Sequence, residues 1–260
     1  MSAERPHDSI LSSAPLQRVW LWLRSYADAF GDVLFPPRCA GCGQVGTILC
    51  DTCMARFEPI VAPYCVRCGQ PIQTGTLCAM CQRGRFRYLD IARSAARFQP
   101  PLQQIIHDFK YRGNTRLAEP LADYMSRRLR VEALRVDAII PVPLHERRLR
   151  ERGYNQAALL AHHLGRATAI PVREDILVRV RHTRPQVQLG FRERIENMED
   201  AFAVVDPGQV RGQSFLLIDD VMTSGSTLEA CAHALKDAGA KRVLGYTLAR
   251  APFHGENEAD

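Results

Sequence analysis

The chain has 260 residues, 46% of them hydrophobic and 24% charged, which excludes a wholly disordered polypeptide and allows one sizeable α/β domain with a small additional module. It contains no run of 18 uninterrupted apolar residues and no secretory signal pattern, so we expect a cytoplasmic protein without a membrane span. The net charge of +6 includes a basic block at residues 83–194, which hold 23 Lys and Arg against 11 Asp and Glu. This block is either a solvated surface or a surface for a polyanion such as DNA, RNA or a diphosphate.

The N-terminal segment, residues 1–37, carries an amphipathic pattern. Apolar residues between Leu16 and Phe35 recur at helical spacing, and Pro36 and Pro37 end the pattern. We therefore expect a helix ahead of the first domain, with an apolar face that more often docks on its own protein than on a membrane.

Cysteines define the next segment, residues 38–83. Two C-x-x-C pairs supply the four thiolates of a tetrahedral zinc site. Gly43 and Gly69 follow the first and third pairs, where a glycine lets the backbone turn and point N–H groups at the sulfurs. The spacing predicts a double zinc ribbon with two structural zinc ions, whose folding depends on the metal. Its eight expected ligands are Cys39, Cys42, Cys50, Cys53, Cys65, Cys68, Cys78 and Cys81.

Several alternatives stay open for this module. A disulfide scaffold would need an oxidising compartment, to which nothing in the sequence directs the chain. The pairs combine either sequentially or in a crossed arrangement, with the first pair joining the third. The module either binds nucleic acid or a partner protein, or it is purely structural. The ninth cysteine, Cys231, is expected to be a small buried hydrophobe.

Residues 84–255 alternate between helical and strand periods, which predicts an α/β domain with a parallel sheet flanked by helices. The patterns predict helices at 102–111, 117–134, 156–164 and 227–238, and strands at 136–142, 176–180, 201–205, 214–218 and 242–248. Gly239 stands where a glycine ends a helix.

The most informative motif follows the strand at 214–218. Two acids, Asp219 and Asp220, precede a loop of small and hydroxyl residues, Thr223 to Thr227, which leads into a helix. Such a loop can aim backbone N–H groups and the positive end of a helix at one phosphate, and Gly225 permits close backbone approach. The carboxylates suit ribose hydroxyls or a hydrated Mg²⁺. The motif therefore predicts a site for a ribose 5-phosphate.

This motif resembles the site for 5-phosphoribosyl-1-diphosphate (PRPP) in type I phosphoribosyltransferases. The order of motifs along the chain resembles the ComF family of competence proteins: four C-x-x-C pairs, His107 to Gly113, Pro141 to Leu144, Arg152 to Gln156, and then the PRPP motif. The resemblance covers roughly residues 33–250, with Ser224 in place of the commoner Thr. It implies a type I phosphoribosyltransferase-like fold that binds PRPP with Mg²⁺. The implied PRPP contacts are Asp219, Asp220, Val221, Thr223, Ser224, Gly225, Ser226 and Thr227.

The resemblance places the diphosphate near residues 139–143, and arginines follow there at high density. We expect Lys110, Arg112, Arg147, Arg148 and Arg152 to contact diphosphate or nucleic acid, although an exposed helix face is an alternative for the arginines. The long polar stretch from Arg179 to Asn197 is the candidate for a loop that covers the site.

Two functions follow. The first is a phosphoribosyltransferase with an unidentified acceptor, involved in DNA uptake or utilisation. The second is a non-enzymatic component that binds single-stranded DNA, through arginines that include Arg150 and Arg184, with PRPP as a regulatory ligand. Other DNA-uptake proteins are expected partners in either case. No residue declares itself a general base.

Overall fold

The computed structural model describes residues 36–129, 135–181 and 201–252. The expected helix at 16–35, the end of the helix expected at 117–134, Arg184 and most of the stretch from Arg179 to Asn197 lie outside these ranges. Within them, no helix is long and apolar enough to cross a membrane.

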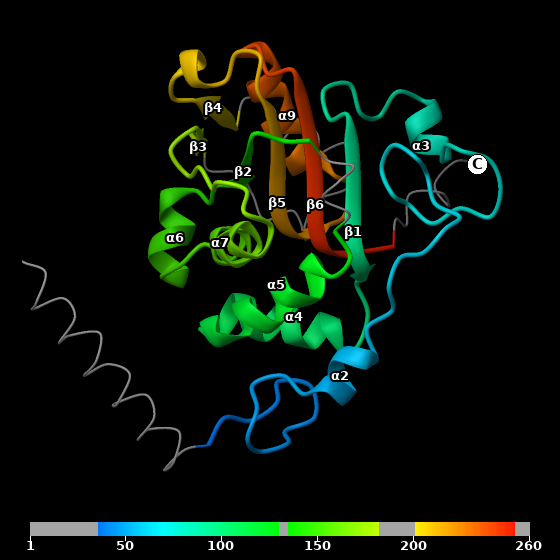
Figure 1. The fold of residues 1–260 in the computed structure, drawn as a ribbon, viewed down its shortest axis with the longest axis vertical. Helices are drawn as coiled ribbons and strands as arrows, with labels where there is room; N and C mark the ends of the chain where they lie inside the picture. The colour runs from blue at the N-terminus through cyan, green and yellow to red at the C-terminus, as the bar shows by residue number, and fades with distance from the viewer. Residues whose placement is uncertain (1–35, 130–134, 182–200, 253–260) are drawn as a thin grey trace, which may run out of the picture.

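A four-stranded parallel sheet forms the centre of the molecule (Figure 1). Its strands are β1 (Ile91–Arg97), β6 (Arg242–Arg250), β5 (Ser214–Met222) and β2 (Ala138–Pro141), in that spatial order. Each neighbouring pair is parallel. The expected strands at 176–180 and 201–205 form a separate antiparallel pair, β3 (Leu177–Arg179) and β4 (Phe202–Val204).

Strand β5 is buried on both faces, as a central parallel strand should be. Its alternate residues enter two different cores. Leu216 and Ile218 pack with helices α4 (Leu102–Tyr111), α5 (Ala118–Ser126) and α7 (Gln156–Thr168). Phe215 and Leu217 pack with α9 (Ser226–Asp237), which Figure 1 shows behind the sheet.

The remaining helices are short. They are α2 (Asp51–Ala55), α3 (Ala79–Gln82) and α6 (Glu146–Arg152), with 3₁₀ turns at Thr115–Leu117 and Pro207–Gln209. Sequence patterns did not predict β1, and α6 corresponds to the exposed helix face that was the alternative for its arginines. Gly239 adopts a φ of 93° after α9, which confirms its place at the helix end.

The cysteine module joins the two cores at separate points. Cys39, Cys50 and Cys53 belong to the core of α4 and α5, whereas the four cysteines from Cys65 to Cys81 belong to the core of α9. Accordingly, α2 lies near α4 in Figure 1, and α3 lies beyond β1.

Candidate functional site

The eight paired cysteines form two four-sulfur clusters. The first holds Cys39, Cys42, Cys50 and Cys53, the second holds Cys65, Cys68, Cys78 and Cys81, and within each cluster the ligand atoms lie within 4.8 Å of one another. The sulfurs of Cys39 and Cys50 are 3.6 Å apart, as are those of Cys68 and Cys78. A zinc tetrahedron with Zn–S bonds of about 2.3 Å has sulfur–sulfur edges of about 3.8 Å, so both clusters fit zinc.

This geometry settles two alternatives. Each cluster uses consecutive C-x-x-C pairs, so the pairing is sequential and not crossed. All nine cysteines are free thiols, which excludes the disulfide scaffold in this structure. Gly43 and Gly69 adopt φ values of 77° and 72° and donate their N–H groups to the carbonyls of Cys39 and Cys65, at 2.8 Å each. The N–H groups of Gly41 and Cys50 point at the Cys39 sulfur, at 3.4 and 3.3 Å.

Because each cluster has its own four ligands, zinc content should fall in steps. The wild-type protein is expected to contain about two zinc ions, and Cys65→Ser with Cys68→Ser about one. A colorimetric zinc assay on protein unfolded after purification under reducing conditions measures this. Cys231→Ser is the control and should keep both ions. Wild-type protein without zinc, or a double variant with unchanged zinc, would contradict the assignment.

The loop after β5 leads into α9 as expected. Gly225 is the residue before the helix and has a φ of 76°, and the helix begins at Ser226, one residue earlier than the pattern predicted. A Cβ atom on Gly225 would lie 2.6 Å from Cε of Met222 and 2.8 Å from the ring of Phe86. Gly225 is therefore required by its backbone conformation and by packing behind the loop, and this replaces our expectation that it clears space for a ligand.

Two of the expected PRPP contacts, Ser224 and Ser226, turn their hydroxyls toward the protein behind the loop. The hydroxyls of Ser224 and Ser226 are 2.6 Å apart, and both residues are buried. Arg85 donates to the Ser224 carbonyl at 3.2 Å and to the Ser226 hydroxyl at 3.1 Å. Thr223 and Thr227 instead line a cavity in front of the loop. The Ser226 N–H also donates to the Ser224 hydroxyl oxygen, at 3.4 Å. Both hydroxyls and this N–H are thus engaged within the protein and do not point to a ligand in the cavity.

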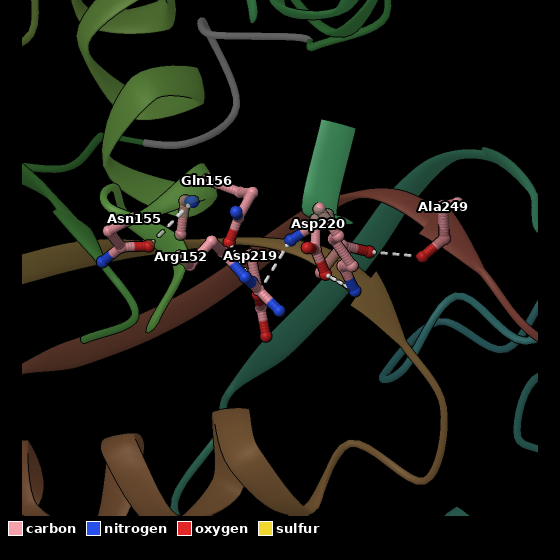
Figure 2. A network of polar contacts seen from close by, with 9 residues as sticks. Arg152, Asn155, Gln156, Asp219, Asp220 and Ala249 are labelled. Atoms are coloured by element: carbon pink, nitrogen blue, oxygen red, sulfur yellow. Dashed lines mark hydrogen bonds and ion pairs between the residues drawn. The ribbon is translucent and has the colours of Figure 1, made fainter. Parts of the chain in front are cut away.

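Asp219 and Asp220 stand at the carboxyl end of β5 (Figure 2). The Asp220 N–H donates to Oδ1 of Asp219 at 2.8 Å, and Lys110 Nζ lies 2.7 Å from Oδ1 of Asp220. Burial and the adjacent charge of Asp220 raise the pKa of Asp219 to about 7. The positive charges of Lys110 and Arg179 act against this rise.

The cavity that these residues share has a volume of about 690 Å³. It lies at the carboxyl edge of the sheet, where open α/β sheets hold their ligands. Both acidic and basic side chains line it, and Glu151 of α6 lies among the lining residues together with the arginines. The charged and hydroxyl residues that line it include Lys110, Arg148, Arg152, Arg179, Asp219, Asp220, Thr223 and Thr227.

Helix α6 divides the expected arginines between two environments. Arg148 and Arg152 line the cavity. Arg147 pairs at 2.9 Å with Glu151, which itself lines the cavity, and Arg150 pairs with Glu146 at 3.3 Å. The four side chains of these two pairs are exposed. Arg112, likewise exposed, pairs with Asp108 at 3.4 Å. Of the five residues expected to contact diphosphate or nucleic acid, the structure brings Lys110, Arg148 and Arg152 to the cavity, and places Arg112 and Arg147 in exposed ion pairs.

The segment Arg152 to Gln156 connects three elements around the cavity by hydrogen bonds, a role that sequence reasoning missed. Tyr154 donates its hydroxyl proton to the Phe109 carbonyl in α4. Asn155 donates to the Val142 carbonyl after β2 at 3.0 Å, and its Oδ1 accepts the N–H of Ala157 at 3.0 Å. These bonds join α4, β2 and α7.

Gln156 and Arg152, which Figure 2 shows near Asn155, form a hydrogen-bonded pair at the cavity. Gln156 accepts this bond through Oε1 and is only 2% exposed. Its Nε2 has no hydrogen-bond partner among the described residues, so it remains a buried donor beside the cavity.

Sequence reasoning also missed Arg179 and Tyr111 as residues of the cavity wall. Arg179 lies on β3, with its guanidinium 5.4 Å from the centre of the Phe202 ring. Tyr111 is 63% exposed, and Arg152 stacks over its ring at 5.2 Å. Burial and the nearby Arg148 lower the pKa of Arg179. Tyr111 lies in the motif at residues 107–113 and Arg179 opens the stretch that we expected to cover the site, but no pattern assigned either side chain to the cavity wall.

The raised pKa of Asp219 makes stability depend on pH. Between its ordinary value near pH 4 and the folded value near pH 7, the folded state binds more protons than the unfolded state, so this group destabilises the protein increasingly as pH rises. Asp219→Asn removes the effect. Its stabilisation relative to wild type should be greater at pH 8 than at pH 5.5, by about 1–2 kcal/mol.

Urea denaturation at both pH values measures this difference. Asp175→Asn is the control, because an exposed hydrogen bond from Arg173 lowers the pKa of Asp175 to about 2 and its contribution is constant over this range. An Asp219→Asn effect that is equal at the two pH values would contradict the raised pKa.

Comparison with known proteins agrees with this two-part organisation. Residues 30–82 match the model of the double zinc ribbon domain, and residues 149–258 match that of the phosphoribosyl transferase domain. Our boundaries at 37/38 and 83/84 stay predictions.

Three relatives span most of the chain. Competence protein F of Haemophilus influenzae is 33% identical over 210 residues, which cover 78% of this chain and 90% of the relative. DNA utilization protein YhgH of Escherichia coli strain K12 is 31% identical, with the same coverage of both chains. Competence protein ComFC of Bacillus subtilis is 28% identical and is covered to 84%.

Proposed function

Because this chain belongs to the ComF family, we propose that it binds PRPP in the cavity at the carboxyl edge of its sheet and serves the uptake or utilisation of DNA. The proposal of PRPP binding rests on one observation: three kinds of chemical group line the same cavity. Two threonines of the loop at residues 223–227, the two carboxylates and four cationic side chains all line it.

We assign each kind of group to one part of PRPP. The backbone N–H groups of residues 223–227 and the start of α9 would hold the 5-phosphate. Asp219 and Asp220 would accept hydrogen bonds from the ribose hydroxyls. Arg148 and Arg152 would bind the diphosphate, and the unpaired Nε2 of Gln156 offers a further donor. Carboxylate oxygens also suit Mg²⁺, which would neutralise part of the diphosphate charge.

Transfer of the phosphoribosyl group is the chemistry that such a site supports. The bond between ribose C1 and the diphosphate oxygen breaks, the electron pair leaves with diphosphate, and a nucleophile of the acceptor bonds to C1. Arg148 and Arg152 would stabilise the charge that develops on the leaving group. We therefore propose a phosphoribosyltransferase whose acceptor is unidentified. Labelled PRPP with Mg²⁺ and candidate acceptors tests this, since transfer requires acceptor-dependent release of diphosphate.

The two faces of α6 provide a matched pair of variants. Arg148→Ala with Arg152→Ala removes two charged hydrogen-bond donors, each worth about 1.5–3 kcal/mol, and should weaken PRPP binding about tenfold or more. Arg147→Ala with Arg150→Ala removes the same charge from exposed ion pairs and should change the affinity less than about twofold. Calorimetric titration measures both, and equal losses would contradict the assignment of the diphosphate to the cavity side of α6.

The structure supports binding of single-stranded DNA less well than binding of PRPP. Arg112, Arg147 and Arg150 are matched with carboxylates, which lowers their value as a phosphate surface. The same variants decide the matter if they are titrated with a short oligonucleotide at low and physiological salt. Salt-sensitive DNA binding that Arg147→Ala with Arg150→Ala abolishes, while PRPP binding persists, would favour the binding component over the enzyme.

A cytoplasmic location is part of this proposal. Zinc ligation requires eight reduced thiols, which a reducing compartment maintains. The proposed binding of PRPP also requires a compartment in which PRPP is present.

A further inference from the structure

The two zinc clusters differ in their distance from the loop at residues 223–227, which we call the phosphate loop. The second cluster shares a core with Phe86, Met222 and Leu228, which lie beside the loop or in the helix that follows it. The first cluster packs against α4 and α5, and a Cβ on Gly41 would lie 2.6 Å from the Cys53 sulfur and 3.5 Å from Cδ1 of Ile105. Among the hydrogen bonds of the described residues, none joins the first cluster to residues 222–227.

Arg250 connects the second cluster to the strand that carries the loop. It ends β6 and is only 7% exposed. Its guanidinium donates to the Cys68 carbonyl at 2.7 Å and lies 3.6 Å from the Cys68 sulfur. The same nitrogen that bonds the carbonyl lies 3.0 Å from the sulfur of Met222, which immediately precedes the loop.

The charge of the cluster explains why an arginine can be buried here. Zinc carries two positive charges and four thiolates carry four negative ones, so a filled cluster has a net charge of −2. No Asp or Glu forms a salt bridge with Arg250 among the described residues. The cluster is therefore the counter-ion of Arg250, and a buried cation deprived of its counter-ion destabilises its surroundings strongly.

A second connection leaves the cluster four residues after Cys81. Arg85 donates to the Ser224 carbonyl at 3.2 Å and to the Ser226 hydroxyl at 3.1 Å. The next residue, Phe86, packs against Gly225 so closely that a Cβ there would lie 2.8 Å from its ring. The chain that leaves the second cluster thus forms the back wall of the loop.

We propose that the second zinc cluster positions the phosphate loop, through Arg250 and the segment Arg85–Phe86, so that ligand affinity at the loop depends on zinc in this cluster. The first cluster stabilises α4 and α5 and has no direct part in holding the loop. The use of PRPP as a probe rests on the proposed function, but the positioning of the loop does not.

Arg250→Met tests the coupling without touching a zinc ligand. The variant should retain about two zinc ions. The amides of residues 223–228, which are the loop and the next residue of α9, should exchange hydrogen at least about tenfold faster in the ligand-free protein, as expected when local opening becomes easier. Its affinity for PRPP should fall about tenfold or more. Arg250→Lys keeps a positive charge beside the cluster but loses the forked pair of donors. Its exchange rates and PRPP affinity should lie between those of Arg250→Met and wild type.

Arg93→Met is the matched control. Arg93 also binds the second ribbon, donating to the Val66 carbonyl at 2.8 Å, but none of its hydrogen bonds reaches a sulfur or the loop. Both the exchange of residues 223–228 and the affinity should stay within about twofold of wild type.

The outcomes separate the two proposals. Loop exchange and affinity that Arg250→Met leaves unchanged, in protein that contains two zinc ions, would overturn the positioning role. A wild type that binds no PRPP would overturn the proposed function, while hydrogen exchange at residues 223–228 would still decide the positioning role. Equal loop exchange in Cys39→Ser with Cys42→Ser and in Cys65→Ser with Cys68→Ser would contradict the difference between the clusters.

Discussion

Replacing Asp219 and Asp220 together by Asn is expected to weaken PRPP binding by about tenfold or more in a protein that still folds. The substitution keeps the shape of both side chains and removes the charge that accepts hydrogen bonds from ribose hydroxyls or attracts Mg²⁺. A hydrogen bond to a charged group contributes about 1.5–3 kcal/mol, so the loss of two such acceptors exceeds a factor of ten. Folding should survive because Asn keeps the shape and a carbonyl acceptor at both positions, and because the raised pKa of Asp219 shows that its charge is unfavourable in the folded state.

Inorganic phosphate provides the internal control for this variant. It needs only the loop and the start of α9, and the double variant also releases Lys110 from its 2.7 Å contact with Asp220. Phosphate should therefore bind as before or slightly better. Asp90→Asn is the matched control, because Asp90 also pairs with a lysine, Lys236 at 2.9 Å, but precedes β1 at the opposite edge of the sheet. Equal PRPP affinity in wild type and the double variant would show that the two carboxylates do not contribute to PRPP binding.

Gly225→Val is expected to abolish binding of both PRPP and phosphate and to lower the free energy of unfolding. A β-branched residue at a φ of 76° is strained, which costs about 1–3 kcal/mol. In addition, its Cβ would meet the Met222 side chain and the Phe86 ring at 2.6 and 2.8 Å, and overpacking of this kind costs about 1–3 kcal/mol more. Because Phe86 belongs to the back wall, the loop itself must move away from its position.

Gly212→Val separates the two effects. Gly212 has a φ of 74°, but a Cβ there would have no atom within 4 Å. This control should show the backbone strain alone, with ligand affinity unchanged. Urea denaturation and calorimetry on both variants measure the difference. If Gly225→Val bound phosphate like Gly212→Val, the loop would not be the phosphate site.

Local patterns predicted those parts of the molecule that depend on neighbours in sequence. The helix at 102–111 was predicted with its bounds, because its apolar residues repeat at helical spacing and two prolines precede it. The cysteine knuckles were predicted because each needs only a C-x-x-C pair, and the first and third add a glycine in a left-handed turn. The strand at 214–218 was predicted because a central parallel strand is a continuous apolar run, but β5 continues to Met222 and includes both acids, which the apolar pattern could not predict.

Other features depend on contacts that no local pattern records. The arginines near 147–152 were recognised as a group, but only the phase of α6 against the cavity separates Arg148 and Arg152 from Arg147 and Arg150. Phe86 lies 139 positions from Gly225, so the packing that requires this glycine was not predictable from the motif itself. Strand β1 was missed because its small and charged residues carry no strong strand pattern.

Calorimetric titration of the zinc-loaded wild-type protein with PRPP and Mg²⁺ tests the central claim most directly. The arrangement of the cavity predicts one saturable site per chain, whose heat diminishes when the protein is first saturated with inorganic phosphate, because both ligands need the loop at residues 223–227. No binding by folded protein that contains two zinc ions, or PRPP binding that phosphate leaves unaffected, would contradict it.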